Sequence, residues 1–219
     1  MMGDSTMADK PDLTYPERGW GQLLPVFFDS TFVIENHAKN GRSTRSFIYE
    51  GRWDSLFSKL KTGDYLVIQF GHNDGSIQKT ERYATPIEYR YNLKKFITEA
   101  RSKGVNPILC TPIVRRNFEN GVLTDTHGEY PGIMREISKE LKVPLIDMHQ
   151  KSMKMISALG EENSLPYFLQ IEAGKFEKYP EGKIDNTHFS EKGAKAIDSL
   201  FIEGIKEQHI KIEQYIKHE

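Results

Sequence analysis

A serine, an aspartate and a histidine occur in this 219-residue chain within short motifs that together could carry out acyl transfer. Ser5 lies in a Gly-Asp-Ser-Thr run, and Asp185 and His188 lie in an Asp-Asn-Thr-His run near the other end of the chain. A serine hydroxyl is nearly inert near neutral pH, so it needs an imidazole base and a carboxylate that fixes the tautomer of that imidazole. The pattern therefore predicts Ser5 as nucleophile, His188 as base and Asp185 as the partner of His188.

Two further motifs supply hydrogen-bond donors. Gly41 lies in Lys-Asn-Gly-Arg, and Asn73 lies in Gly-His-Asn-Asp. A tetrahedral intermediate carries negative charge on the former carbonyl oxygen, which requires donors aimed at that oxygen. We expect this oxyanion hole to be formed by the backbone N–H of Ser5 at the start of a helix, the backbone N–H of Gly41 and the side-chain amide of Asn73. His72 is expected to order the loop or line the cleft rather than to act as the base.

The residue pattern also predicts the elements that must position these side chains. Short apolar runs bounded by Gly, Pro, Asn or Asp are typical of buried parallel strands. After a first strand that ends at Gly3, such runs occupy residues 31–34, 65–70, 105–111 and 143–147. Helical periodicity covers residues 19–28, 53–60, 86–103, 132–141 and 148–159, and a last helix is expected after Ser190 as N-cap. This alternation predicts a doubly wound α/β fold with a five-stranded, mainly parallel sheet, in a single domain over residues 1–219.

The strand order explains how distant motifs could meet. In an open parallel sheet, ligands bind beyond the carboxyl ends of the strands. Ser5, Gly41 and Asn73 each follow an expected strand, and the loop with Asp185 and His188 follows the last one, so residues 183 positions apart (188 minus 5) can converge. Because few residues precede Gly3, we expect the first strand to be truncated and poorly tied down.

Composition excludes several classes of partner. The chain has 30 basic and 31 acidic residues and a formal net charge of -1, so neither nucleic acid nor an anionic membrane surface is expected to bind it. No stretch is apolar and long enough to span a bilayer, and no signal peptide is visible. The one cysteine, Cys110, excludes an internal disulfide and is expected in the core. The Asp-x-His spacing at Asp147 and His149 ends a buried strand, and no metal site is expected there.

The sequence contains four motifs that resemble, in order, the four signature blocks of the SGNH or GDSL-type hydrolase superfamily. They are residues 3–5, Gly41, residues 71–74 and residues 185–188. Within this superfamily, the longer strings Gly-Asp-Ser-Thr-Met-Ala-Asp-Lys, Gly-Arg-Ser-Thr-Arg-Ser-Phe and Gln-Phe-Gly-His-Asn-Asp resemble the rhamnogalacturonan acetylesterase family. This resemblance implies a flavodoxin-like α/β/α sandwich and removal of acetyl groups from pectic polysaccharide or oligosaccharide, without a metal or organic cofactor. It gives the same triad and oxyanion roles to the residues named above. It also implies an extracellular or periplasmic location, with a cytoplasmic one left open, and it leaves the oligomeric state unknown.

The residues say less about the substrate. A galacturonate polymer carries carboxylates and sugar faces, for which arginines and aromatic rings at the rim of a cleft are suited. The candidates for these contacts are Arg42, Arg45, Arg115, Arg116, Tyr167, Phe168, Phe176 and Tyr179. For each aromatic residue, core packing or loop anchoring is at least as plausible as sugar binding.

Two alternative functions stay open at this point. One is a lipid or thioester hydrolase on the same scaffold, and the other is a catalytically inactive carbohydrate-binding protein. The chain lacks an apolar lid segment of the kind that an acyl-chain site would need, which favours the carbohydrate esterase over the first alternative. The complete set of five site residues argues against the second.

Overall fold

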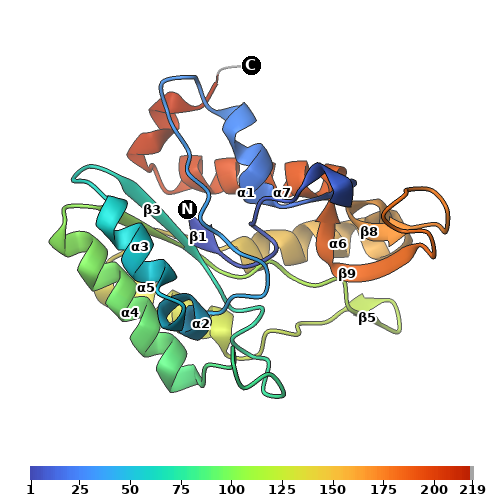
Figure 1. The fold of residues 1–219 in the computed structure, drawn as a ribbon, viewed down its shortest axis with the longest axis horizontal. Helices are drawn as coiled ribbons and strands as arrows, with labels where there is room; N and C mark the ends of the chain where they lie inside the picture. Colours follow the sequence, from blue (N-terminus) through green and yellow to red (C-terminus); the bar gives the residue numbers. More distant parts are fainter. Residues whose placement is uncertain (218–219) are drawn as a thin grey trace.

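The computed structural model of the protein describes residues 1–217, which form a central parallel sheet with helices on both faces (Figure 1). The strands of this sheet lie in the order β1-β3-β4-β7, and all three pairings are parallel. Their bounds are β1 (Met2–Gly3), β3 (Tyr65–Gln69), β4 (Asn106–Cys110) and β7 (Leu145–Ile146). Because the strands are parallel, their carboxyl ends lie on the same side of the sheet, and the predicted site residues Ser5 and Asn73 follow β1 and β3 there.

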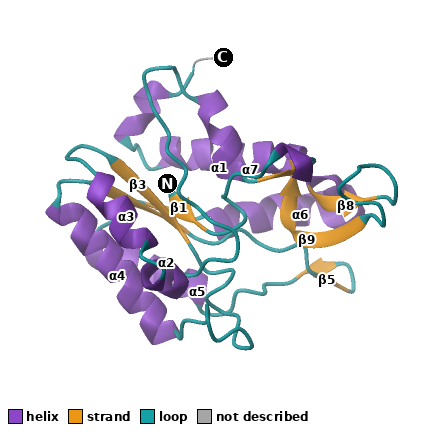
Figure 2. Cartoon of the chain, viewed as in Figure 1, coloured by secondary structure: helices purple, strands orange, loops and turns teal. Residues whose placement is uncertain are grey.

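The helices divide into two layers, one on each face of the sheet (Figure 2). One layer contains α2 (Thr44–Tyr49), α3 (Arg52–Lys59), α4 (Pro86–Ser102) and α5 (Tyr130–Leu141). The other contains α1 (Trp20–Leu23), α6 (Met148–Ser164) and α7 (Glu191–Glu207). Short 3₁₀ turns complete the described chain: η1 (Asp12–Thr14), η2 (Leu24–Phe27), η3 (Leu165–Tyr167) and η4 (Lys211–Tyr215).

Successive side chains of the central strands pack alternately into the two cores, one on each face of the sheet. In β3, Leu66 and Ile68 pack into the core on the α4 side, whereas Val67 packs into the core on the α7 side. Successive side chains of a strand point to opposite faces, so a fully buried strand must be apolar at nearly every position. Cys110 ends β4 as a buried residue of the α7-side core, as expected.

A smaller antiparallel sheet stands beside the parallel one and carries the carboxyl-terminal site residues (Figure 1). Its strand order is β2-β9-β8, with bounds β2 (Glu17–Arg18), β8 (Phe168–Ile171) and β9 (Lys183–Ser190). A two-stranded hairpin, β5 (Phe118–Glu119) and β6 (Val122–Leu123), lies between α4 and α5 in the sequence. The motif with Asp185 and His188, expected in a loop, therefore lies on a strand.

The expected strand at residues 31–34 does not form, so the parallel sheet has four strands rather than five. In its place, an extended segment a few residues later runs along the free edge of β1. The N–H of His37 donates to the carbonyl of Met1 at 2.9 Å, and the N–H of Lys39 donates to the carbonyl of Gly3 at 3.0 Å. β1 is as short as expected, but these bonds and its pairing with β3 hold it on both sides, contrary to the expectation that it is poorly tied down.

The predicted helices are found, with changes at their ends. Residues 19–28 form the short helix α1 followed by η2, because Pro25 removes an N–H that a continuing helix needs. The structure extends α6 to Ser164, past a kink at Gly160 where φ is 75°. Ser190 caps α7 as predicted, and its Oγ accepts the N–H of Gly193 at 3.1 Å.

Gly193 sets the contact between α7 and the segment that precedes β8. A Cβ added at Gly193 would lie 1.8 Å from the carbonyl oxygen of Tyr167. We expect Gly193→Ala to destabilise the protein, because backbone must shift and overpacking of this kind costs about 1–3 kcal/mol. Gly132 is the matched control, since it is also the third residue of a helix and a Cβ there meets nothing within 4 Å. Gly132→Ala should raise Tm slightly, by the helix propensity of alanine. Equal Tm values for the two variants would contradict this contact.

Candidate active site

Ser5 lies in a tight turn directly after β1. The carbonyl of Asp4 accepts the N–H groups of Met7 and Ala8, so the chain makes a single helix-like turn. It does not continue as the helix that the sequence predicted, because Pro11 has no N–H to offer the carbonyl of Met7. That carbonyl instead accepts the side-chain amide of Asn36 at 2.9 Å.

The three residues of the predicted triad lie together, and hydrogen bonds join each to the next. Nε2 of His188 lies 2.8 Å from Oγ of Ser5, and Nδ1 of His188 lies 2.8 Å from Oδ2 of Asp185. A carboxylate can only accept, so Nδ1 carries the proton and Nε2 is left free to take the proton of the serine hydroxyl. This is the arrangement that a serine nucleophile requires.

An irregularity in β9 aims His188 at the serine. Phe168 of β8 pairs with Phe189, but the next residue, Leu169, pairs with Asp185. Residues 186–188 are therefore extra residues of β9 that bulge out of the ladder. Bulges of this kind re-aim side chains next to active sites. Within this bulge, Oδ1 of Asp185 accepts the backbone N–H of Thr187 and of His188, each at 2.9 Å.

The charge of Asp185 is stabilised locally. Partial burial opposes the charged form, but hydrogen bonds from the ring and the backbone N–H of His188 outweigh it and hold the pKa of Asp185 well below its usual range. Asp185 therefore stays ionised across the physiological range and can stabilise the imidazolium that forms when His188 takes a proton.

The predicted oxyanion donors line the same cleft as the triad. Gly41 adopts a φ of 76°, a left-handed conformation that favours glycine. Among residues 1–217, no acceptor bonds the N–H of Ser5 or of Gly41. The side-chain amide of Asn73 donates one hydrogen to the carbonyl of Arg42 at 2.9 Å, which leaves the second hydrogen available.

Arg82 fixes the orientation of the Asn73 amide. Its Nη1 donates to Oδ1 of Asn73 at 3.0 Å, and the same nitrogen lies 3.4 Å from where a Cβ at Gly41 would stand. A guanidinium has no acceptor, so Oδ1 of Asn73 must face it and Nδ2 must point away. Arg82 thus touches both segments that supply the outer oxyanion donors.

Asp74 joins these two segments a second time. Its Oδ1 accepts the backbone N–H of Thr44 at 2.9 Å and the hydroxyl of Thr44 at 2.6 Å. Burial raises the pKa of Asp74 to about 7, although the hydrogen bonds from Thr44 oppose the shift. The turn after β3 and the start of α2 are therefore held as one unit around Asn73 and Gly41.

The cleft above these groups has a volume of about 460 Å³ and a polar lining. Ser5, His188, Gly41, Asn73 and His72 all contribute to its wall, as predicted for each. The other lining residues are Glu17, Asn40, Ser76, Lys79, Arg82, Arg115, Lys183 and Thr187. Among residues 1–217, no aliphatic side chain and no Phe, Tyr or Trp belongs to this lining.

Several side chains that the sequence offered for substrate contact lie elsewhere. Of the four arginines, only Arg115 lines the cleft. Arg42 and Arg45 pair with Glu50 and Glu88, and Arg116 is buried against Ser164. None of the four candidate aromatic residues lines the cleft, and Phe168 and Tyr179 belong to buried cores.

Sequence reasoning missed Lys79, Arg82 and Lys183 as cleft residues. Lys79 and Arg82 belong to an irregular loop between β3 and α4, where no periodicity could place them. For Lys183, the only indication in the sequence was its position two residues before Asp185. Nζ of Lys183 lies 3.6 Å from Oδ2 of Asp185.

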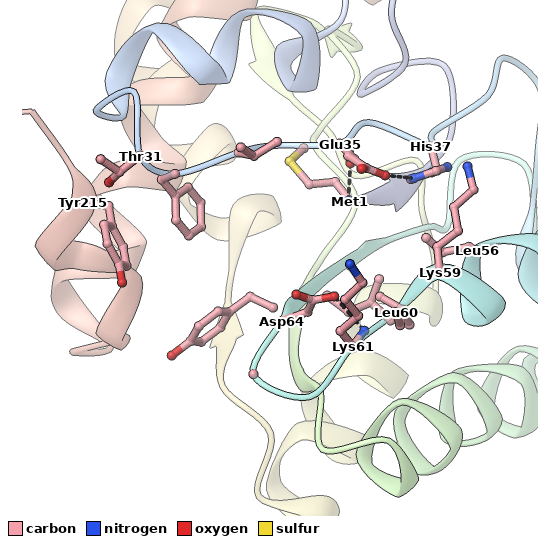
Figure 3. Close-up of a pocket in the computed structure, with 15 residues that line it drawn as sticks. Met1, Thr31, Glu35, His37, Leu56, Lys59, Leu60, Lys61, Asp64 and Tyr215 are labelled. Atoms are coloured by element: carbon pink, nitrogen blue, oxygen red, sulfur yellow. Dashed lines mark hydrogen bonds and ion pairs between the residues drawn. The ribbon is translucent and has the colours of Figure 1, made fainter.

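A second hollow, of about 450 Å³, lies at the opposite edge of the sheet (Figure 3). Its wall includes His37, together with Met1 and Tyr65, which lie where β1 and β3 begin. His37 is bonded there to Glu35 at 3.0 Å, and the lining contains no serine or cysteine. This hollow therefore lacks the pair of serine and histidine that is found in the cleft at Ser5.

The two residues of the Asp-x-His spacing near β7 make separate sets of contacts. Asp147 caps α6 and binds Arg135, with 2.7 Å between Nε and Oδ2. His149 does have further potential ligands beside it, because Asp125 and His127 bring ligand atoms within 4.8 Å of one another.

Comparison with known proteins agrees with this geometry. Residues 1–196 match the model of the GDSL-like lipase/acylhydrolase family. The chain belongs to this family. It is 41% identical over 217 residues to a rhamnogalacturonan acetylesterase of Bacillus subtilis, covering 99% of this chain and 92% of that one. It is 26% identical over 226 residues to a rhamnogalacturonan acetylesterase of Emericella nidulans, covering 94% and 83%.

The fold also matches solved structures of this kind. A catalytic mutant of an acetylxylan esterase from Geobacillus stearothermophilus superimposes with a TM-score of 0.67 at 16% identity, covering 100% of this chain and 95% of that one. The α/β fold predicted from the sequence and its membership of the SGNH or GDSL-type hydrolases are confirmed, and the protein is an esterase. Over the described part of the chain, no helix has the length and apolarity needed to cross a membrane.

Arg82 offers a direct test of how Asn73 is oriented. We expect Arg82→Met to lower kcat on 4-nitrophenyl acetate at least about tenfold, a part of the 10²- to 10³-fold cost of losing an oxyanion donor. Arg45→Met is the matched control, because Arg45 is a partly exposed arginine that pairs with Glu88 and does not line the cleft. If both variants kept wild-type kcat, Arg82 would have no part in holding the amide.

Proposed function

We propose that the protein removes acetyl groups from acetylated pectic polysaccharide, rhamnogalacturonan, through an acetyl-enzyme on Ser5. The observation that carries the proposal is the continuous hydrogen-bonded series of Ser5, His188 and Asp185 in a polar, cationic cleft. The names of the relatives from Bacillus subtilis and Emericella nidulans point to the same substrate.

The mechanism follows from the positions of these groups. Oγ of Ser5 attacks the carbonyl carbon of the acetyl ester while Nε2 of His188 takes the hydroxyl proton. The charge on the former carbonyl oxygen is met by the N–H groups of Ser5 and Gly41 and by the amide of Asn73. His188 then gives its proton to the sugar oxygen as the bond from carbon to that oxygen breaks. Water, activated by the same imidazole, attacks the acetyl-enzyme and releases acetate.

The charge of the cleft favours an acidic polymer. Four cations line it, Lys79, Arg82, Arg115 and Lys183, against one acidic residue, Glu17. Glu17 is itself paired with the buried Lys10 at 2.8 Å. A galacturonate chain would bring carboxylates to this excess of positive charge, whereas a neutral xylan would not.

The alternatives fit the cleft less well. A lipid or acyl-thioester substrate needs an apolar groove for its chain, and no aliphatic side chain lines this cleft. A purely carbohydrate-binding role would leave the 2.8 Å bonds of His188 to Ser5 and Asp185 without purpose.

Acetate release measures both the reaction and the polymer. We expect faster release from acetylated rhamnogalacturonan than from acetylated xylan, and little hydrolysis of long-chain esters. Raising the salt concentration should increase KM for the acidic polymer, because mobile ions screen exposed charges. Acetylated xylan is the control, since its KM should not respond. Equal rates and equal salt dependence for the two polymers would reject the acidic substrate while leaving the esterase mechanism intact.

A further inference from the structure

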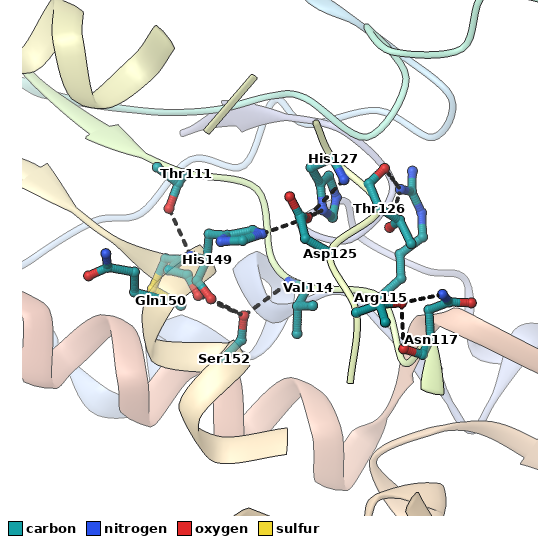
Figure 4. Close-up of polar contacts among 12 residues, drawn as sticks. Thr111, Val114, Arg115, Asn117, Asp125, Thr126, His127, His149, Gln150 and Ser152 are labelled. Carbon is teal, nitrogen blue, oxygen red and sulfur yellow. Dashed lines mark hydrogen bonds and ion pairs between the residues drawn. The ribbon is translucent and has the colours of Figure 1, made fainter. Parts of the chain in front are cut away.

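Three buried histidines and the partly exposed carboxylate of Asp125 form a chain of contacts next to the turn that carries Asn73. His149 lies at the amino-terminal end of α6, and Asp125 and His127 lie in the loop that precedes α5 (Figure 4). Nε2 of His149 is 2.9 Å from Oδ1 of Asp125. Nδ1 of His127 is 3.4 Å from the same oxygen, and Nε2 of His127 is 3.2 Å from Nδ1 of His72. The series therefore ends on the residue that precedes Asn73.

Arg135 determines which atoms donate and which accept hydrogen bonds along this chain of contacts. Nη2 of Arg135 lies 3.5 Å from Nδ1 of His149 and 3.1 Å from Oδ1 of Asp147. A guanidinium only donates, so Nδ1 of His149 must accept. Nε2 of His149 then carries a proton, which it donates to Asp125.

The same reasoning continues through His127 to His72. Burial lowers the pKa of His127 to about 4, although Asp125 opposes the shift, so its ring carries one proton near neutral pH. Nδ1 of that ring faces the carboxylate of Asp125, which favours the proton there and leaves Nε2 as an acceptor. His72 must then donate from Nδ1. Burial holds the pKa of His72 well below its usual value, so its Nε2 is unprotonated.

The cluster also has the composition of a metal site, and the geometry argues against that role. A metal ion would need the lone pair of His149 Nε2, which would move the proton of the ring to Nδ1 and turn that proton toward Arg135. In addition, Oδ1 of Asp125 already accepts the backbone N–H of His127 at 2.9 Å and the ring N–H of His149 at 2.9 Å. Both are distances of direct hydrogen bonds, whereas Nδ1 of His127, at 3.4 Å from the same oxygen, makes a charge contact and no hydrogen bond.

His72 is held from both its ring and its backbone. Its carbonyl accepts Nη2 of Arg115 at 2.9 Å, while its ring meets His127 edge to face with 4.7 Å between centroids. The preceding Gly71 has a φ of 138°, and a Cβ there would lie 2.8 Å from Pro112. The backbone entering Asn73 is therefore fixed by the segment that follows β4.

We propose that the contacts from Arg135 through His149, Asp125 and His127, which are hydrogen bonds except for the charge contact between Asp125 and Nδ1 of His127, form a proton-ordered relay that holds His72 in its Nδ1–H form and thereby positions Asn73. The relay residues are positioning residues for ester hydrolysis, and the inference rests on the proposed oxyanion role of Asn73. Since Nε2 of His72 has no proton, His72 itself cannot donate to the oxyanion.

The tautomer of His72 is a direct readout that needs no substrate. Long-range ¹H–¹⁵N correlation spectra of the ¹⁵N-labelled wild-type protein should show His72 protonated at Nδ1 and unprotonated at Nε2. A proton on Nε2 of His72 would overturn the relay. So would stoichiometric binding of Zn²⁺ that His149→Gln abolishes, because the cluster would then be a metal site.

Kinetics on 4-nitrophenyl acetate test the positioning role, independently of which polymer is the substrate. His127→Phe leaves Nδ1–H of His72 without an acceptor, and kcat should fall about tenfold with KM within about twofold, since small misplacements weaken catalysis steeply. His127→Gln can still accept near the position of Nε2, so it should restore most of kcat. His37→Phe, at the opposite edge of the sheet, is the control and should match wild type.

Two kinetic results would contradict the proposal. One is wild-type kcat in His127→Phe. The other is an equal loss of kcat in His127→Phe and His127→Gln at unchanged Tm, which would mean that the acceptor at Nε2 is irrelevant. If His127→Phe fails to fold, the wild-type tautomer and the kcat of His127→Gln still decide the question.

Discussion

Ser5 follows a strand of the parallel sheet and His188 lies on a strand of the antiparallel sheet, so the 2.8 Å bond between them depends on how firmly the two sheets are held together. Trp20 is the central part of that connection. Its backbone N–H donates to the carbonyl of Thr6 at 3.0 Å, and its indole N–H donates to Gln69 at the end of β3, also at 3.0 Å. The same ring packs on Phe201 of α7 with 5.0 Å between centroids. The nucleophile turn, the parallel sheet and the helix that follows β9 are thus joined through one buried side chain.

A second set of contacts holds the predicted oxyanion donors, which come from three separate segments. Asp74 ties the turn after β3 to Thr44, and Arg82 faces the amide of Asn73 from one side. The segment after β4 reaches the same turn through Arg115 and the ring of His72. Such preorganised donors lower the barrier because they need no rearrangement when charge develops on the oxyanion. The loops of this edge are irregular, so side-chain hydrogen bonds hold them in place of a backbone ladder.

The sequence could nominate candidate site residues because acyl transfer restricts their types and the parallel sheet restricts their places. Ser5, Gly41, Asn73, Asp185 and His188 all lie in or beside one cleft, as predicted. The prediction of a strand at residues 31–34 was wrong, because an apolar run does not show which segment forms hydrogen bonds with β1. Residues 37 and 39 form those bonds instead. The place of His188 on a bulged strand was missed, since the register of β9 depends on its pairing with β8.

The long-range polar contacts could not be predicted at all. Nothing in the sequence joins Arg82 to Asn73, or His149 to Asp125, because these pairs meet only through irregular loops. Short motifs identify groups that react, whereas the groups that orient them are scattered along the chain. This is why the charge of the cleft, on which the proposed substrate depends, was visible only in the folded structure.

The account stands on a nucleophile at Ser5 that His188 activates across the two sheets. Labelling with a serine-directed organophosphonate, followed by peptide mapping by mass spectrometry, tests this claim most directly. The account predicts one adduct per chain, on Ser5, and much slower labelling of the His188→Ala variant. An adduct on another residue, or equally fast labelling of Ser5 without His188, would contradict it.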